Sequence, residues 1–152
     1  MHLLARGAAN VSAGESAGTA AKTIIAEEKA AGKRLPGFGH RVHTDDPRSH
    51  RLLALARAAN ASGAHVAVAE AIVWELAAGG KALPLNVDGA IAAVLADLGF
   101  HPDLANGFFI LARTVGWMAQ VFEERQREKP MRRIDQSAAV YDGPGARELP
   151  HD

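Results

Sequence analysis

Four residues have side chains suited to proton transfer and anion binding. His40 lies in a glycine-flanked loop that ends at Arg48, and Asp88 follows a helix-capping asparagine. Arg113 lies in an apolar helix face, where a guanidinium needs an anion. An imidazole can polarise a carbonyl, and a carboxylate can remove a carbon-bound proton. Arginines can orient carboxylates in bidentate pairs. This set predicts an enzyme that holds a small multi-carboxylate substrate and moves a proton.

Each of these residues also has an interpretation without chemistry. His40 fits a hydrogen-bonded loop histidine, and Asp88 fits a residue that compensates a helix dipole. Arg113, among Phe109, Ile110, Gly116 and Trp117, fits a snorkelling arginine or an internal salt bridge as well as an arginine that awaits an anionic ligand. The loop also holds donor types of a metal site, namely His40, His43, Asp45 and Asp46. Their spacing is a weak metal signal, and we predict no metal.

The segment that carries His40 is built as a rigid loop. Gly37 and Gly39 permit positive φ or close approach to a ligand. Asp46 is predicted to cap a helix that has Pro47 at its first position and Arg48 directly behind it. A connection between two helices does not by itself need two histidines and two arginines, so the loop is expected to face a ligand.

The hydrophobic pattern around this loop is helical, and we predict an all-α fold. Ser12 and Glu15 fit a capping box that opens an alanine-rich helix ending at Gly32. Three further helices are expected from Pro47 to about Asn60, from Ala64 to Ala78 and from Asn86 to Gly99. The longest helix is expected to run from Pro102 to Pro130, with a close packing contact at Gly116. An irregular tail follows from Met131.

Composition excludes several classes of protein. The 152 residues are 48% hydrophobic, and 17 basic residues balance 17 acidic ones, so nothing favours nucleic acid or an anionic membrane as a partner. The sequence has no cysteine, which removes disulfides and thiolate zinc sites. No apolar run reaches the roughly 18 residues of a membrane span, and we expect a cytoplasmic protein.

Three motifs resemble the citrate synthase and citryl-CoA lyase family. They are PGFGHRVHTDDPR (36–48), PLNVDGAIA (84–92) and FILARTVGW (109–117), in the family's order and at about its spacing. The closing KPMRRIDQSAAVYDGPG (129–145) is similar to the end of the short, lyase-like members. The resemblance implies a Claisen condensation of acetyl-CoA with oxaloacetate, or the reverse cleavage of citryl-CoA.

The resemblance also implies roles for individual residues. His40 matches the histidine that protonates the oxaloacetate carbonyl, Asp88 the aspartate that removes the acetyl-CoA methyl proton, and Arg48 and Arg113 the arginines that bind substrate carboxylates. The arginine that many relatives carry before Pro130, which reaches the neighbouring subunit's site, is replaced by Lys129, by Arg132 or by Arg133. Coenzyme A is expected as a substrate with no tightly bound cofactor, contacted by the following residues: Leu35, Pro36, Gly37, Gly39, Arg41 and Asn86.

Against the family pattern, this sequence has no His-Gly-Gly-type motif before the glycine loop, where relatives carry a further catalytic histidine. The resemblance therefore implies a small CoA-binding domain at 1–101, a helix of the large domain at 102–130 and a tail at 131–152. We expect a chain that is inactive alone, or one that works as a homodimer or with a partner chain supplying the large domain. The alternative is a non-catalytic CoA- or carboxylate-binding module, or a subunit of a split enzyme.

Apolar surface supports the expectation of self-association. The alanine-rich helix 12–31 and the apolar helix 106–124 are expected to leave exposed apolar surface if the large domain is absent.

Overall fold

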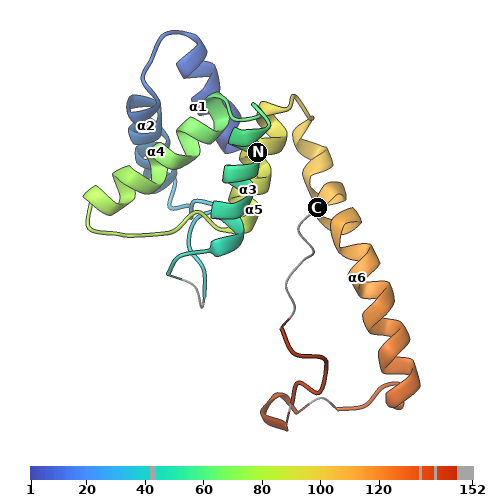
Figure 1. The fold of residues 1–152 in the computed structure, drawn as a ribbon. Coiled ribbons are helices and arrows are strands. Elements are labelled where there is room, and N and C mark those ends of the chain that lie inside the picture. Colours follow the sequence, from blue (N-terminus) through green and yellow to red (C-terminus); the bar gives the residue numbers. More distant parts are fainter. Residues whose placement is uncertain (42–43, 134, 139, 147–152) are drawn as a thin grey trace. The chain divides into compact units, whose positions relative to one another are not determined.

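A computed structural model describes residues 1–41, 44–133, 135–138 and 140–146, and these residues form helices and loops without a strand (Figure 1). The all-α prediction is confirmed. The helices are α1 (His2–Ser12), α2 (Ala17–Ala30), α3 (Pro47–Ala58), α4 (Ala64–Ala78), α5 (Val87–Asp97) and α6 (Ala105–Arg127). Two 3₁₀ turns, η1 (Pro102–Leu104) and η2 (Gln136–Ala138), complete the described elements.

The chain divides into two compact units, Met1–Ala112 and Arg113–Asp152. The first unit holds α1 to α5, η1 and the start of α6, and the second holds the rest of α6 and the tail. The domain boundaries predicted at 101 and 130 stay predictions.

Helix α4 is the centre of the first unit. It packs against α1, α2 and α5, and the α3–α5 pair completes the bundle (Figure 1). Because α4 meets neighbours on several sides, its sequence is apolar nearly all round, and Val66, Val68, Ala69 and Ile72 are fully buried or almost so. Small residues let the helices approach closely, since a Cβ at Gly7 of α1 would lie 2.7 Å from Val68 Cγ1.

The first helical segment differs from the prediction. The chain forms a separate helix, α1, which ends at Ser12, and Gly14 at φ +101° breaks the path before α2. The capping box expected at Ser12 and Glu15 is wrong: Ser16 is the cap, and its Oγ accepts from the Thr19 backbone N–H at 3.1 Å. The Ser12 hydroxyl instead donates to the Ala8 carbonyl inside α1.

The caps around the loop motif are confirmed. Asp46 caps α3 with Pro47 at the first position, and Asn86 caps α5 by accepting from the N–H groups of Asp88 and Gly89. The predicted bounds of α4 are also confirmed. Since an aspartate or asparagine cap satisfies backbone N–H groups that have no partner inside the helix, these starts are fixed locally.

A buried carboxylate joins the end of α5 to the start of α4. The Asp97 side chain, 5% exposed, accepts from the backbone N–H groups of Gly63 (2.6 Å), His65 (2.9 Å) and Val66 (3.0 Å), and from His65 Nδ1 (2.8 Å). Burial raises the pKa of Asp97, but these hydrogen bonds together outweigh burial and hold it below its usual value. Asp97 therefore serves as the N-terminal cap that Gly63, the capping residue of α4, cannot supply.

Asp97→Asn is expected to lower the free energy of unfolding by about 2 kcal/mol at pH 7, because an amide offers one acceptor where the carboxylate uses two. Since the folded pKa is depressed, this contribution is present above the unfolded value near 3.9 and is lost as pH falls through the folded value. Thermal melts from pH 7 to pH 3 should show a shallower acid loss in Asp97→Asn. Asp103→Asn, an exposed control, should follow the wild type; equal profiles for all three chains would contradict the assignment.

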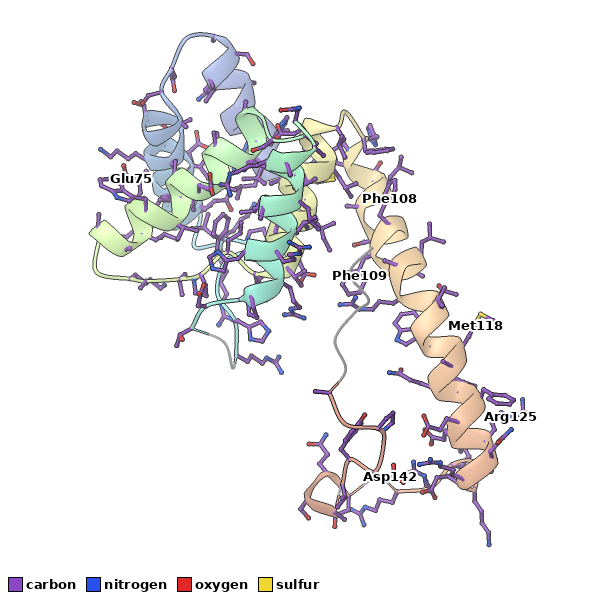
Figure 2. All side chains as sticks on the ribbon, in the orientation of Figure 1. Glu75, Phe108, Phe109, Met118, Arg125 and Asp142 are labelled. Atoms are coloured by element: carbon purple, nitrogen blue, oxygen red, sulfur yellow. The ribbon has the colours of Figure 1, made fainter. Side chains whose placement is uncertain are left out.

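Helix α6 carries no buried residue among those described. Its large apolar side chains are exposed: Ile110, Leu111, Val115, Trp117, Met118, Val121 and Phe122; Figure 2 labels Met118, which projects from the helix. The expected apolar surface is thus confirmed for α6. It is wrong for the alanine-rich segment, whose Ala20, Ala21 and Ile24 are buried.

The close packing predicted at Gly116 is also wrong within the described chain, because no atom there lies within 4 Å of a Cβ built on Gly116. Of the helices that the structure describes, none combines the length and the apolar character of a membrane span.

Candidate functional site

The glycine loop is held against the start of α5 by backbone hydrogen bonds. The Gly39 N–H donates to the Pro84 carbonyl at 2.7 Å, and the Asn86 N–H donates to the Gly37 carbonyl at 3.0 Å. Between them, Phe38 and Leu85 form an isolated antiparallel bridge, and both side chains are buried. His40 and Asp88, far apart in the sequence, thereby lie on two segments that are tied together.

Two glycines make this contact possible. A Cβ at Gly37 would lie 2.8 Å from the Gly89 Cα, and one at Gly89 would overlap the Gly37 carbonyl oxygen and lie 2.6 Å from Leu85 Cδ1. Gly37 and Gly39 both have φ +88°, which disfavours other residues. The backbones of the loop and of α5 therefore touch directly, without intervening side chains.

The side chain of Asn86 fastens the same junction. Its Oδ1 accepts from the N–H groups of Asp88 and Gly89, each at 3.1 Å, and its Nδ2 donates to the Gly39 carbonyl at 2.9 Å. Asn86 thus spans from the first turn of α5 to the residue before His40. These bonds give Asn86 a structural role; the predicted contact with an acyl-CoA chain stays a prediction.

Arg48 and His40 lie side by side, with Asp46 beneath Arg48. Arg48 donates from Nε to Asp46 Oδ1 and from Nη2 to Asp46 Oδ2, both at 2.9 Å, and Nη2 lies 3.4 Å from His40 Nε2. The Asp46 side chain is fully buried, whereas that of Arg48 is 47% exposed. The guanidinium of Arg48 is therefore held by the buried Asp46 carboxylate and remains accessible to a ligand from solvent.

Asp88 lies within electrostatic reach of this pair. Hydrogen bonds with Asp46 raise the pKa of Arg48 against the opposing effect of burial, and the charge of Asp88 raises it further. The same hydrogen bonds from Arg48 hold the pKa of Asp46 far below its usual range although burial opposes this. The imidazole of His40 and the guanidinium of Arg48 are thus neighbours, and the exposed carboxylate of Asp88 is close enough to Arg48 to act on it electrostatically.

A cleft of about 800 Å³ opens beside His40. It lies between the C-terminal ends of α2 and α4 and the loops that follow them. Its apolar lining residues are Ile25, Leu35, Phe38, Leu76 and Leu83. This cleft belongs wholly to the first unit, and His40 stands on its wall.

Cations gather around the cleft: Lys29, Lys33, Arg34, Arg41 and Lys81. Two carboxylates also line it, but Glu28 pairs with Arg6 at 2.6 Å and Glu75 with Lys22 at 3.6 Å; Figure 2 labels Glu75 on α4. With both acidic groups paired to cations that do not line the cleft, the five basic side chains set its charge. An apolar wall with a cationic rim suits a ligand that has an apolar portion and several phosphates.

The predicted coenzyme A residues separate into two groups. Leu35, Gly39 and Arg41 line the cleft with His40. Pro36 lines a different surface pocket, with α1 residues, and Gly37 and Asn86 form the loop–helix junction. Leu35, Gly39 and Arg41 are therefore accessible to a ligand in the cleft. Gly37 and Asn86 instead hold the loop in its conformation against α5.

The remaining predicted substrate residues, Arg113, Lys129 and Arg132, belong to the second unit. Arg113 is partly exposed on α6. Arg132 pairs with Glu124 at 3.2 Å and Glu128 at 3.3 Å, and a shallow surface pocket includes Lys129 beside it. Their contact with a substrate stays a prediction.

The metal alternative involved His43, which lies outside the described residues. Among those described, no three histidine, aspartate or glutamate side chains are grouped to hold a metal ion.

Sequence reasoning missed two features of the site. Asp46 was predicted as a helix cap and considered as a metal donor, but its paired hydrogen bonds to the Arg48 guanidinium were not predicted. The basic rim was not predicted, although Lys33 and Arg34 directly precede the glycine loop and Lys81 follows the Gly79–Gly80 pair. The signal was present in both cases, but it needed the knowledge that the ends of α2 and α4 meet at the same cleft.

Comparison with known proteins connects this geometry to a family. Residues 4–134 match the family model described as citrate synthase, C-terminal domain. The putative citrate synthase 2 of Mycobacterium bovis is 34% identical over 132 residues, which cover 84% of this chain and 34% of that protein. The chain thus spans about a third of the length of this curated relative.

Two solved structures that superpose on this chain point to the same family or fold. The citryl-CoA lyase from Hydrogenobacter thermophilus superposes with a TM-score of 0.69 at 39% identity, over 98% of this chain and 60% of that one. Citrate synthase from Thermotoga maritima superposes with a TM-score of 0.64 at 22% identity, over 98% of this chain and 41% of that one, and shows the shared fold. The chain belongs to the citrate synthase and citryl-CoA lyase family.

Proposed function

We propose that the cleft binds a coenzyme A thioester and that His40, Arg48 and Asp88 make or break the carbon–carbon bond of citryl-CoA. The observation that carries the proposal is that His40 lines a cleft with an apolar wall and a basic rim and lies 3.4 Å from Arg48, while backbone hydrogen bonds tie its loop to the start of the helix that carries Asp88. The family membership supports the substrate class, since the named relatives include citrate synthases and a citryl-CoA lyase.

The rim suits the polyphosphate part of coenzyme A. Lysines bind phosphates as compact charges, and arginines bind them in bidentate pairs. The apolar wall, which includes Leu35 and Phe38, offers a surface to the adenine ring or to the pantetheine chain. With the phosphates on the rim and His40 on the wall, the thioester end is expected to point toward His40.

In the condensation direction, the Asp88 carboxylate removes a methyl proton from acetyl-CoA and leaves an enolate. The enolate carbon attacks the keto carbon of oxaloacetate, and His40 gives a proton to the oxygen of that keto group, which yields citryl-CoA. Arg48 holds a carboxylate of oxaloacetate next to His40. Hydrolysis of the thioester by water then releases coenzyme A and citrate, whereas a lyase runs the carbon–carbon step in reverse.

A second candidate is a CoA- or carboxylate-binding module without turnover, alone or as one subunit of a split enzyme. The observation that favours it is the lining of the cleft, which includes His40 but neither Arg48 nor Asp88. Both candidates use the same cleft. They differ in whether the 152 residues turn over substrate.

Turnover in both directions separates the candidates. A thiol reagent follows coenzyme A release from acetyl-CoA plus oxaloacetate, and the chain contributes no thiol because it has no cysteine. In the lyase direction, oxaloacetate formed from citryl-CoA is measured with a coupled dehydrogenase.

For catalysis, the expected result is a rate above buffer that falls by roughly 100-fold or more in His40→Gln, since the amide cannot donate a proton as an imidazolium does. His101→Gln, which changes an exposed imidazole outside the cleft, is the matched control and should leave the rate unchanged. No rate in either direction, with coenzyme A still bound, would favour the binding module.

A further inference from the structure

The carboxylate beneath Arg48 does more than cap a helix. Both oxygens of Asp46 are used: Oδ1 accepts from the Arg48 backbone N–H at 3.1 Å and from Nε at 2.9 Å, and Oδ2 accepts from Nη2 at 2.9 Å. A cap alone needs one acceptor, which serine or asparagine also provides. The paired bonds to the guanidinium need two oxygens and a negative charge.

The same carboxylate reaches the helix that carries the proposed base. Asp46 Oδ2 also accepts from the N–H of Val87 at 3.1 Å, and Val87 is the first residue of α5, next to Asp88. The two residues are 41 positions apart in the sequence. A single buried side chain therefore contacts both Arg48 and the first turn of α5.

The orientation of Arg48 follows from these bonds. A guanidinium offers two bidentate edges, Nε with one Nη, and Nη1 with Nη2. Asp46 occupies the first edge, and Nη2, which also belongs to the second edge, lies 3.4 Å from His40 Nε2, so the guanidinium is held beside His40. The partly exposed side chain is then fixed in one geometry before a ligand arrives, which reduces the entropy that binding would otherwise remove.

We propose that Asp46 is a positioning residue, which sets the angle of Arg48 and its spacing from Asp88. The inference rests on the proposed function, because it takes the ligand of Arg48 to be a dicarboxylate such as oxaloacetate. Asp46 itself is fully buried and does not contact the ligand. Its effect passes through Arg48 and through the first turn of α5.

Asp46→Asn separates positioning from capping. Asparagine is an equally good cap, so α3 should still start at Pro47. The neutral amide offers one oxygen instead of two, so the paired bonds to Arg48 are lost. Asp45→Asn is the matched control, since Asp45 is the adjacent residue, is exposed and contacts His50 instead.

The experiment uses the whole chain labelled with ¹⁵N at arginine, with the Arg48 Nε–H signal assigned by its disappearance in Arg48→Lys. In the wild type this proton is expected to exchange slowly with water and its signal to shift on titration with oxaloacetate. In Asp46→Asn we expect exchange roughly tenfold faster and affinity for oxaloacetate about 10-fold to 100-fold weaker. Coenzyme A affinity should stay within twofold, which a general loss of structure would not allow.

Slow exchange and unchanged oxaloacetate affinity in Asp46→Asn would overturn the inference, as would an equal effect of Asp45→Asn. If the wild type binds no oxaloacetate but Asp46→Asn still speeds exchange of the Arg48 Nε–H, then Asp46 does position Arg48, and the proposed function is wrong. If Asp46→Asn does not fold, Asp46→Ser, which also caps a helix, takes its place with the same expected results.

Discussion

Gly89→Ala is expected to lower the free energy of unfolding of the first unit by about 3 kcal/mol. The added methyl group would overlap the Gly37 carbonyl oxygen and lie 2.6 Å from Leu85 Cδ1. Backbone on one side and buried leucine on the other leave little room to adjust, so the loop must separate from α5. The intrinsic gain of alanine over glycine in a helix, about 1 kcal/mol, is too small to compensate.

Gly107→Ala is the matched control for this substitution. Gly107 is also a helical glycine, but nothing in the described structure lies within 4 Å of a Cβ at that position. Alanine there is expected to be neutral or stabilising by up to about 1 kcal/mol. Urea unfolding followed by circular dichroism measures both variants, and a Gly89→Ala chain as stable as Gly107→Ala would contradict the described contact.

Asp88→Asn is expected to reduce turnover in either direction by at least about 100-fold while coenzyme A affinity stays unchanged. The amide has nearly the shape of the carboxylate but cannot take a proton from carbon. The backbone bond from Asp88 to the Asn86 cap does not involve the side chain, so α5 should start at the same residue. Because the Asp88 side chain is exposed at the first turn, the loss of its dipole interaction should cost only about 0.5 kcal/mol.

Asp103→Asn serves as the control, since Asp103 is an exposed acidic residue at the start of another helical turn in the same unit. Turnover assays and coenzyme A titrations of the two variants, made at one pH, separate an effect on proton transfer from an effect on coenzyme A binding. Equal activity of Asp88→Asn and the wild type would remove Asp88 from the proton transfer.

The elements that sequence reasoning predicted well are those with local signals at both ends. Helix α4 begins after Gly63 and ends before the Gly79–Gly80 pair, and the mostly apolar residues between them favour a buried helix. Helices α3 and α5 begin directly after their capping residues, Asp46 and Asn86, whose side chains accept hydrogen bonds from backbone N–H groups within three residues. Each of these boundaries depends on interactions between neighbours in the chain.

Helix α1 was missed because its stability comes from packing. Gly7 weakens the helix by its own propensity, yet its lack of a side chain admits Val68 and Ile24. Nothing in the segment itself indicates these partners. The start of α2 was predicted wrongly for a similar reason. Both Ser12 and Ser16 could cap a helix, and only the structure shows that the Ser16 hydroxyl caps α2.

The site shows the same division between local and tertiary information. The glycine loop, His40 and the Asp46 cap follow from a short motif. The bond between Asp46 and Val87 and the meeting of Lys33 with Lys81 at one cleft depend on how helices pack. The sequence therefore indicated the proposed reacting groups, whereas the Asp46 contacts that orient Arg48 and the basic rim of the cleft became visible only in the fold.

Calorimetric titration of the chain with coenzyme A shows whether the cleft beside His40 is a coenzyme A site. We expect saturable binding of one coenzyme A per chain, weakened about tenfold in Lys33→Gln/Arg34→Gln, which removes two charges from the cleft rim. Arg51→Gln/Arg57→Gln removes the same charge from α3, outside the cleft, and should leave the affinity unchanged. Absence of saturable binding, or equal weakening by both double substitutions, would contradict a coenzyme A site in this cleft.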